Sequence, residues 1–64
     1  MHSAHVVERL LEWKSESDVD GEEVGPVRIV DADDPDIIYE ELTWMTRRDA
    51  EKLAEQLGHE FTEV

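Results

Sequence analysis

The chain has 64 residues, of which 18 are acidic and 6 are basic, so its formal net charge is −12. A negative field of this strength repels the phosphates of nucleic acids, and so short a chain forms one small domain. The absence of cysteine excludes disulfides and cysteine zinc sites, and no apolar run approaches the ~18 residues of a membrane span. We therefore expect a single cytoplasmic domain over residues 1–64, with no nucleic acid or membrane partner.

The N-terminal segment is predicted to form a helix. Ser3 is a suitable N-cap, and the following apolar residues fall on one helical face. Those residues are Val6, Val7, Leu10 and Leu11. A strand is the alternative, but Arg9 would interrupt the apolar side formed by Leu11 and Trp13.

The middle of the chain begins with a polar stretch. Residues 15–25 are rich in serine, aspartate and glutamate, which is typical of a solvated loop that can move. After Pro26, the apolar residues of segment 27–30 surround Arg28 and predict a short strand. Residues 31–36 contain aspartates and a proline, so we expect a turn there.

Two interpretations compete for residues 37–45. A strand would place Ile38, Leu42 and Trp44 on one face and Ile37, Tyr39 and Met45 on the other. A helix would begin at Asp34 as the N-cap, with Pro35 in its first position. The β-branched and aromatic residues favour the strand.

A helix over residues 47–57 is the best-defined prediction. Thr46 can cap it, with Asp49 three residues later as in a capping box, and Gly58 follows where a left-handed C-terminal cap is needed. Its apolar stripe consists of Ala50, Leu53, Ala54 and Leu57. Residues 61–64 then predict a short final strand.

These elements predict a small α+β domain in the order α-β-β-α-β. We expect a three-stranded, mainly antiparallel sheet with both helices packed on one face. The other face would then be exposed or covered by a second copy of the chain.

No pattern for metal binding or catalysis emerges. A calcium loop starting at Asp31 would place Leu42 where a bidentate glutamate is required. His2 and His5 are three residues apart, but a closed zinc site needs about four ligands and His59 is distant. The sequence also lacks a cysteine nucleophile, a glycine-rich phosphate loop and a nucleophile elbow. We expect neither a cofactor nor an enzyme.

The strand face that carries Ile37, Tyr39 and Met45 has no helix to cover it and would suit a partner. The strongest interaction candidates are apolar residues of this strand and one pair of arginines. They are Ile37, Tyr39, Trp44, Met45, Arg47 and Arg48. The arginines lie in the first turn of the predicted helix, where its dipole disfavours cations. Pairing with Glu51 is a sufficient explanation for their presence, and the aromatic residues could equally belong to the core.

Acidic residues are dispersed along the whole chain instead of forming a tail. This composition resembles that of proteins from salt-accumulating haloarchaea, although it points to no particular family. Salt screens charge repulsion, so we expect a folded domain in concentrated salt and a looser one in low salt. The sequence therefore predicts a halophilic, non-enzymatic protein-interaction module that self-associates as a homodimer. An accessory subunit of a different protein is the alternative, and a metal-binding protein or enzyme is the third possibility.

Overall fold

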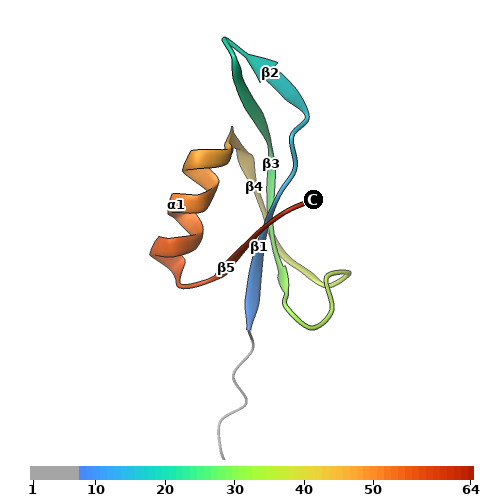
Figure 1. The fold of residues 1–64 in the computed structure, drawn as a ribbon. Coiled ribbons are helices and arrows are strands. Elements are labelled where there is room, and N and C mark those ends of the chain that lie inside the picture. The colour runs from blue at the N-terminus through green and yellow to red at the C-terminus, as the bar shows by residue number, and fades with distance from the viewer. Residues whose placement is uncertain (1–7) are drawn as a thin grey trace, which may run out of the picture.

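The structure, a computed structural model, describes residues 8–64, and within this range the chain forms five strands and one helix (Figure 1). The elements are β1 (Arg9–Trp13), β2 (Ser17–Val19), β3 (Glu22–Asp31), β4 (Ile38–Thr46), α1 (Arg47–Leu57) and β5 (Glu60–Glu63). The fold belongs to the α+β class. The predicted arrangement of three strands and two helices is wrong.

A single mixed sheet organises the chain, with β3 at its centre. Along one edge of β3, residues 27–31 pair with β1 and residues 22–24 pair with β2, so β1 and β2 lie end to end. Along the other edge β3 pairs with β4, and all three pairings are antiparallel. Strand β5 pairs with β1 in parallel. The lateral order is therefore β4, β3, β1 and β5, with β2 extending β1.

The N-terminal helix prediction is wrong for the described residues, because Arg9–Trp13 is strand β1. Leu11 and Trp13 are fully buried, whereas Glu12 between them lies on the opposite side of the sheet. Leucine and glutamate favour helices on their own, but pairing with both β3 and β5 overrides that preference. Ser3, Val6 and Val7 lie outside the described residues.

Residues 15–25, expected to be a loop, form most of a hairpin that extends away from the rest of the sheet (Figure 1). Its turn consists of Asp20 and Gly21, which both have positive φ angles of 53° and 81°. Two such residues form the turn that best matches the twist of a hairpin. The Asp-Gly pair is the sequence signal for this turn, and the surrounding acidic residues obscured it.

The connection between β1 and β2 follows β3 very closely. The amide of Lys14 donates to the Pro26 carbonyl at 3.3 Å, and the amide of Glu16 donates to the Val24 carbonyl at 2.9 Å. A Cβ atom on Gly25 would lie 1.5 Å from the carbonyl oxygen of Lys14. Only glycine fits this position, and it allows β1 and β2 to run along the same edge of β3.

Residues 38–46 form strand β4, so the strand interpretation of 37–45 is confirmed. Two register shifts in its pairing with β3 break the simple alternation of its side chains. Leu42 lies beside Val27 and Met45 lies beside Gly25, and both side chains pack against the core. Trp44, next to Met45, is exposed.

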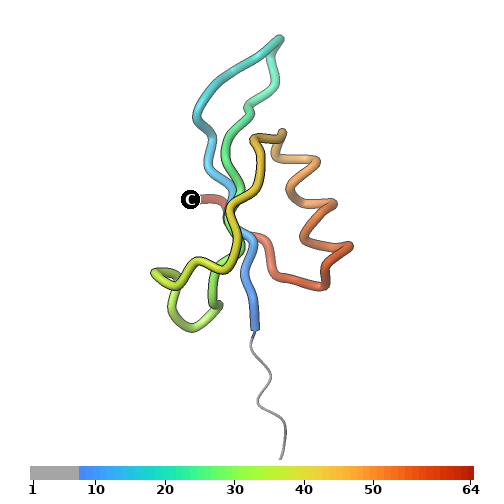
Figure 2. Tube along the Cα trace, turned by 180° about the vertical axis from the view of Figure 1, so that it is seen from behind, coloured from blue at the N-terminus to red at the C-terminus, as the bar shows by residue number. Residues whose placement is uncertain are grey.

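Helix α1 begins and ends as predicted. The Thr46 hydroxyl accepts a hydrogen bond from the amide of Asp49 at 3.2 Å, and Gly58 adopts the left-handed conformation at the C-terminal end. Its buried residues are Ala50 and Ala54, whose small side chains allow the helix to lie close to the sheet. Both views show α1 along one side of the sheet only (Figures 1 and 2).

The core lies between α1 and the sheet and is small. Its buried members are Leu11, Trp13, Val27, Ile29, Ala50 and Ala54, with Leu42, Met45, Leu53 and Phe61 partly buried around them. Trp13 is its largest side chain, and its indole Nε1 donates a hydrogen bond to the Met45 carbonyl at 2.9 Å. This bond ties β1 to β4 across the central strand.

Candidate interaction surface

The sheet face opposite α1 is not covered by a helix of the described chain, and we call it the open face. On β1, β3 and β5 it carries the side chains that alternate with the core residues. Register with β3 and alternation along β4 add three further residues to this face. The open face thus comprises Leu10, Glu12, Lys14, Pro26, Arg28, Val30, Ile38, Glu41, Trp44, Glu60, Thr62 and Val64.

A charged row crosses the middle of the open face. From β5 to β4 it runs through Thr62, Glu12, Arg28 and Glu41, which are neighbours across the strands. Arg28 Nε lies 3.8 Å from Glu41 Oε1, and both side chains are more than half exposed. Such an exposed pair contributes little to folding stability. The row nevertheless places a positive charge between two negative ones.

Apolar residues lie on one side of the charged row. Val30 is fully buried although it does not belong to the cluster packed against α1. Leu10 on β1 and Ile38 on β4 are its cross-strand neighbours, and Ile38 is exposed. This part of the open face is thus apolar across β1, β3 and β4, whereas the exposed Glu60 on β5 lies beside Leu10.

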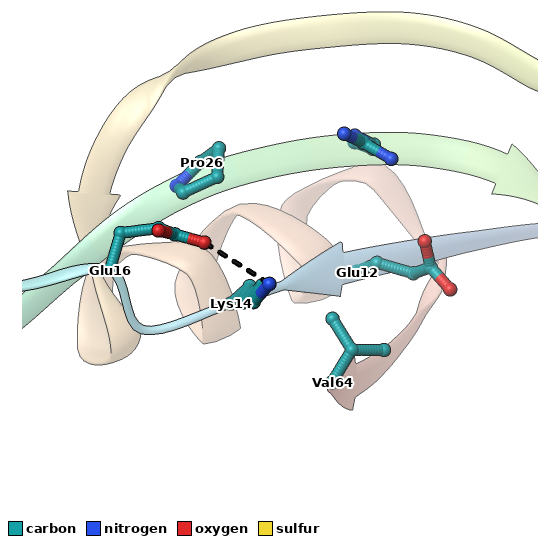
Figure 3. A pocket seen from close by; sticks show the side chains of 6 residues that line it. Glu12, Lys14, Glu16, Pro26 and Val64 are labelled. Atoms are coloured by element: carbon teal, nitrogen blue, oxygen red, sulfur yellow. Dashed lines mark ion pairs between the residues drawn. The ribbon is translucent and has the colours of Figure 1, made fainter.

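On the other side of the charged row lies a shallow pocket of about 150 Å³ (Figure 3). Its lining residues are Glu12, Lys14, Glu16, Pro26, Arg28 and Val64. Lys14 Nζ forms an ion pair with Glu16 Oε1 at 3.3 Å, and α1 lies behind the strands in this view. Small-molecule sites usually enclose ~300–1,000 Å³, so the pocket is too small for a typical ligand.

Two large apolar side chains lie on the two outer strands of the open face. Trp44 on β4 is 53% exposed, and Val64, which follows β5, is 62% exposed. Trp44 points to the open face because the adjacent Met45 packs against the core on the other side. Exposed aromatic and aliphatic groups on one face are typical of protein-interaction surfaces.

Tyr39, a predicted interface residue, takes part in a cluster at the end of the sheet. Its hydroxyl donates to Asp31 Oδ2 at 2.7 Å, and the Arg9 guanidinium lies 4.7 Å from the ring centroid. The hydrogen bond to Asp31 raises the pKa of Tyr39 above its usual value, because it stabilises the neutral phenol. The cluster joins β1, β3 and β4.

The structure separates the other predicted apolar interface residues. Met45 turns toward the core, and Ile37 lies in the turn before β4, where its amide donates to the Asp34 carbonyl. Of the four apolar candidates, only Trp44 lies on the open face. The sequence pattern does not identify Leu10, Glu12 and Arg28 as members of this face, because it predicts a helix for Leu10 and Glu12.

The two arginines at the start of α1 differ in their surroundings. Arg47 Nε forms ion pairs with Glu51 Oε1 at 3.2 Å and Glu63 Oε1 at 3.1 Å. Its guanidinium also lies 5.9 Å from the Phe61 ring centroid. The predicted pairing with Glu51 is therefore confirmed for Arg47. Arg48 is exposed and forms no ion pair with any residue of the described chain.

The aspartates of the turn before β4 organise its backbone. Asp31 Oδ1 accepts hydrogen bonds from the amides of Asp33 and Asp34, and Asp34 Oδ1 accepts one from the amide of Asp36. Within residues 8–64, no three potential metal ligands come together. His2 and His5 lie outside this range.

A scan of protein-family models, a search of curated proteins and a search of solved structures all find no match to this chain. Among residues 8–64, no helix has the length and apolar character needed to cross a membrane. The open face is the most distinctive surface of the described chain.

Proposed function

We propose that this chain is a small, non-enzymatic interaction module of a halophile that self-associates in the cytoplasm through its open face. The observation that carries the proposal is a sheet four strands wide on which the only helix among residues 8–64 lies on one side. The uncovered side exposes Trp44, Ile38 and Val64 and carries both signs of charge.

The small core supports the same proposal. Helix α1 contributes only Ala50 and Ala54 as fully buried side chains, and the chain has no cysteine for a disulfide. Domains of this size commonly need an additional source of stability, and self-association is one of the available sources. Covering the open face would add a second apolar layer to the sheet.

The proposed association is weak and depends on salt. Four strands spaced about 4.8 Å apart give a face about 20 Å wide, which is small for a permanent dimer. Each copy also carries a charge of −12, so two copies repel one another. Salt shortens the Debye length to about 3 Å at 1 M and removes most of this repulsion.

Sedimentation equilibrium over a range of protein concentrations, in about 2 M KCl, tests the proposal. We expect a monomer–dimer equilibrium that shifts toward monomer as KCl is lowered toward about 0.1 M. Replacing Trp44 with serine should weaken the dimer at least about tenfold, as expected for an aromatic residue at an interface. Leu57→Ser is the matched control, because Leu57 is 45% exposed on α1, away from the open face.

A monomer at every concentration and salt level would contradict self-association. Binding to a different protein would then be the remaining candidate function. Arg48 favours that alternative, since it is exposed and unpaired within the described chain and faces a depression beside the acidic hairpin. If Trp44→Ser and Leu57→Ser weakened the dimer equally, that result would also contradict association through the open face.

A further inference from the structure

We infer that two copies pack open face to open face about a two-fold axis that runs parallel to the strands, midway between β1 and β3. This inference rests on the proposed self-association and specifies the partner as a second copy in one register. The axis lies at the centre of the lateral order β4, β3, β1 and β5, so all four strands of each sheet overlap those of the other.

Charge complementarity is the first argument for this axis. Rotation about it places Glu12 of one copy opposite Arg28 of the second copy, and Arg28 opposite Glu12 of the second copy. The two residues are direct neighbours within each chain, on β1 and β3. The charged row that separates the apolar parts of the open face thus forms two symmetric ion pairs between the copies.

Apolar complementarity is the second argument. The same rotation exchanges the two outer strands, so Trp44 on β4 meets Val64 of the second copy, which follows β5. These two side chains are the most exposed apolar groups of the open face, at 53% and 62%. At the level of Leu10, Val30 is already fully buried within each chain, and the rotation places Ile38 opposite Glu60 of the second copy, so the apolar argument rests on Trp44 and Val64.

Other two-fold axes parallel to the strands are less favourable. An axis through β3 places Arg28 against Arg28 of the second copy, which brings like charges together. An axis midway between β3 and β4 pairs Arg28 with Glu41 of the second copy, but it leaves both β1 and β5 of each sheet without an opposite strand. The axis between β1 and β3 satisfies charge and overlap together.

Charge reversal distinguishes these registers. Arg28→Glu brings two carboxylates together at each of the symmetric contacts between identical copies, and Glu12→Arg brings two guanidinium groups together there. Each variant alone should therefore dissociate at least about tenfold more readily. An equimolar mixture of the two variants should restore the dimer as a heterodimer. In it, each of the two symmetric contacts joins a carboxylate of one variant to a guanidinium group of the other. The double variant Glu12→Arg/Arg28→Glu should also dimerise, because it restores opposite charges at both symmetric contacts. Within each sheet it keeps positions 12 and 28 oppositely charged, although it places a carboxylate at position 28 beside Glu41.

Sedimentation equilibrium at a KCl concentration where the natural chain dimerises provides the measurement, with circular dichroism to confirm that each variant is folded. The alternative axis between β3 and β4 predicts a different result. If the dimer is restored by mixing Arg28→Glu with Glu41→Arg, but not by mixing Arg28→Glu with Glu12→Arg, the proposed axis is overturned in favour of that one. The natural chain could also dimerise while neither mixture nor the double variant restores the dimer. That result would overturn the register but not the proposed self-association. A natural chain that never dimerises would overturn both the register and the proposed function.

Discussion

At the scale of single residues, Tyr39 shows how an exposed aromatic side chain can be held by polar contacts. Its hydroxyl donates to Asp31 while Arg9 lies over its ring, and these three residues come from β4, β3 and β1. The sequence predicted Tyr39 as a partner contact, because alternation along the strand placed it on the sheet face that no helix covers. Its actual neighbours lie on two other strands and could not be identified without the register.

The neutral phenol of Tyr39 is stabilised in the fold, so its pKa is raised in the folded chain. A raised pKa means that the hydrogen bond stabilises the fold below pH about 10 and that this contribution is lost as the pH rises through the folded-state pKa. Tyr39 is the single tyrosine of the sequence. Its absorbance near 295 nm should therefore titrate with a midpoint above about 10 in the folded chain and near 10 in denaturant.

The Tyr39→Phe variant is the control for this titration. It should lack the absorbance change and should lose less stability between about pH 9 and 11 than the natural chain, because it has no phenol to ionise. A folded-state midpoint at or below the denatured one would show that the hydrogen bond to Asp31 does not hold the phenol in solution.

At the scale of elements, the sheet depends on the close passage of the β1–β2 connection along β3. Gly25 occupies the point of closest approach, where the Lys14 carbonyl leaves no space for a side chain. Its role differs from that of Gly21 and Gly58, which have positive φ angles and open space around the missing Cβ.

Replacing Gly25 with alanine should therefore destabilise the fold by about 3 kcal/mol or more, since backbone atoms must move to relieve the contact. Gly21→Ala is the matched control and should cost only about 1 kcal/mol, because its strain is conformational and no atom lies within contact distance. Urea unfolding in about 2 M KCl measures both. Similar losses for the two variants would contradict the steric role of Gly25.

The elements that sequence patterns predicted well are those whose signals are local. Helix α1 has its cap at Thr46, its stop at Gly58 and its apolar stripe between them, and all three are present within a few residues. The strand at β4 also followed from local composition. By contrast, β1 has leucines and glutamate that favour a helix, and only its pairing with β3 and β5 makes it a strand.

The candidate surface was predictable only in part for the same reason. The sequence predicted one covered and one uncovered sheet face and included Trp44 among the interface candidates, but it assigned Trp44 to the face opposite Ile37, Tyr39 and Met45. It placed Met45 on the wrong side, since simple alternation does not anticipate the register shifts in β4. Glu12 and Arg28 become candidates only once β1 and β3 are known to be neighbours.

At the scale of the whole molecule, negative charge is spread over the surface with few compensating contacts. In the hairpin, Asp18 lies directly across from Glu23, and like charges in such a pair repel one another. Positive charge is concentrated in a few ion pairs, of which Arg47 with Glu51 and Glu63 is the most extensive in the described chain.

The free energy of unfolding should therefore rise by on the order of 2 kcal/mol between about 0.1 M and 2 M KCl, as screening removes this repulsion. Glu23→Gln should increase stability in low salt and reduce the dependence on KCl. Glu63→Gln is the control. It removes the same single negative charge as Glu23→Gln, but it also removes the ion pair to Arg47. Thermal unfolding at concentrations where the chain is monomeric measures both variants, and a stability independent of KCl would contradict the role of screening.

The parallel pairing of β1 with β5 sets the order in which the sheet can form. The two hairpins of β3 close short loops, whereas Leu10 meets Glu60 only after α1 has returned the chain across the sheet. Contacts between such distant positions carry a larger entropic cost and form slowly. We therefore expect β5 to dock late in folding, and its release would leave the edge of β1 beside Leu11 open to a wrong partner strand.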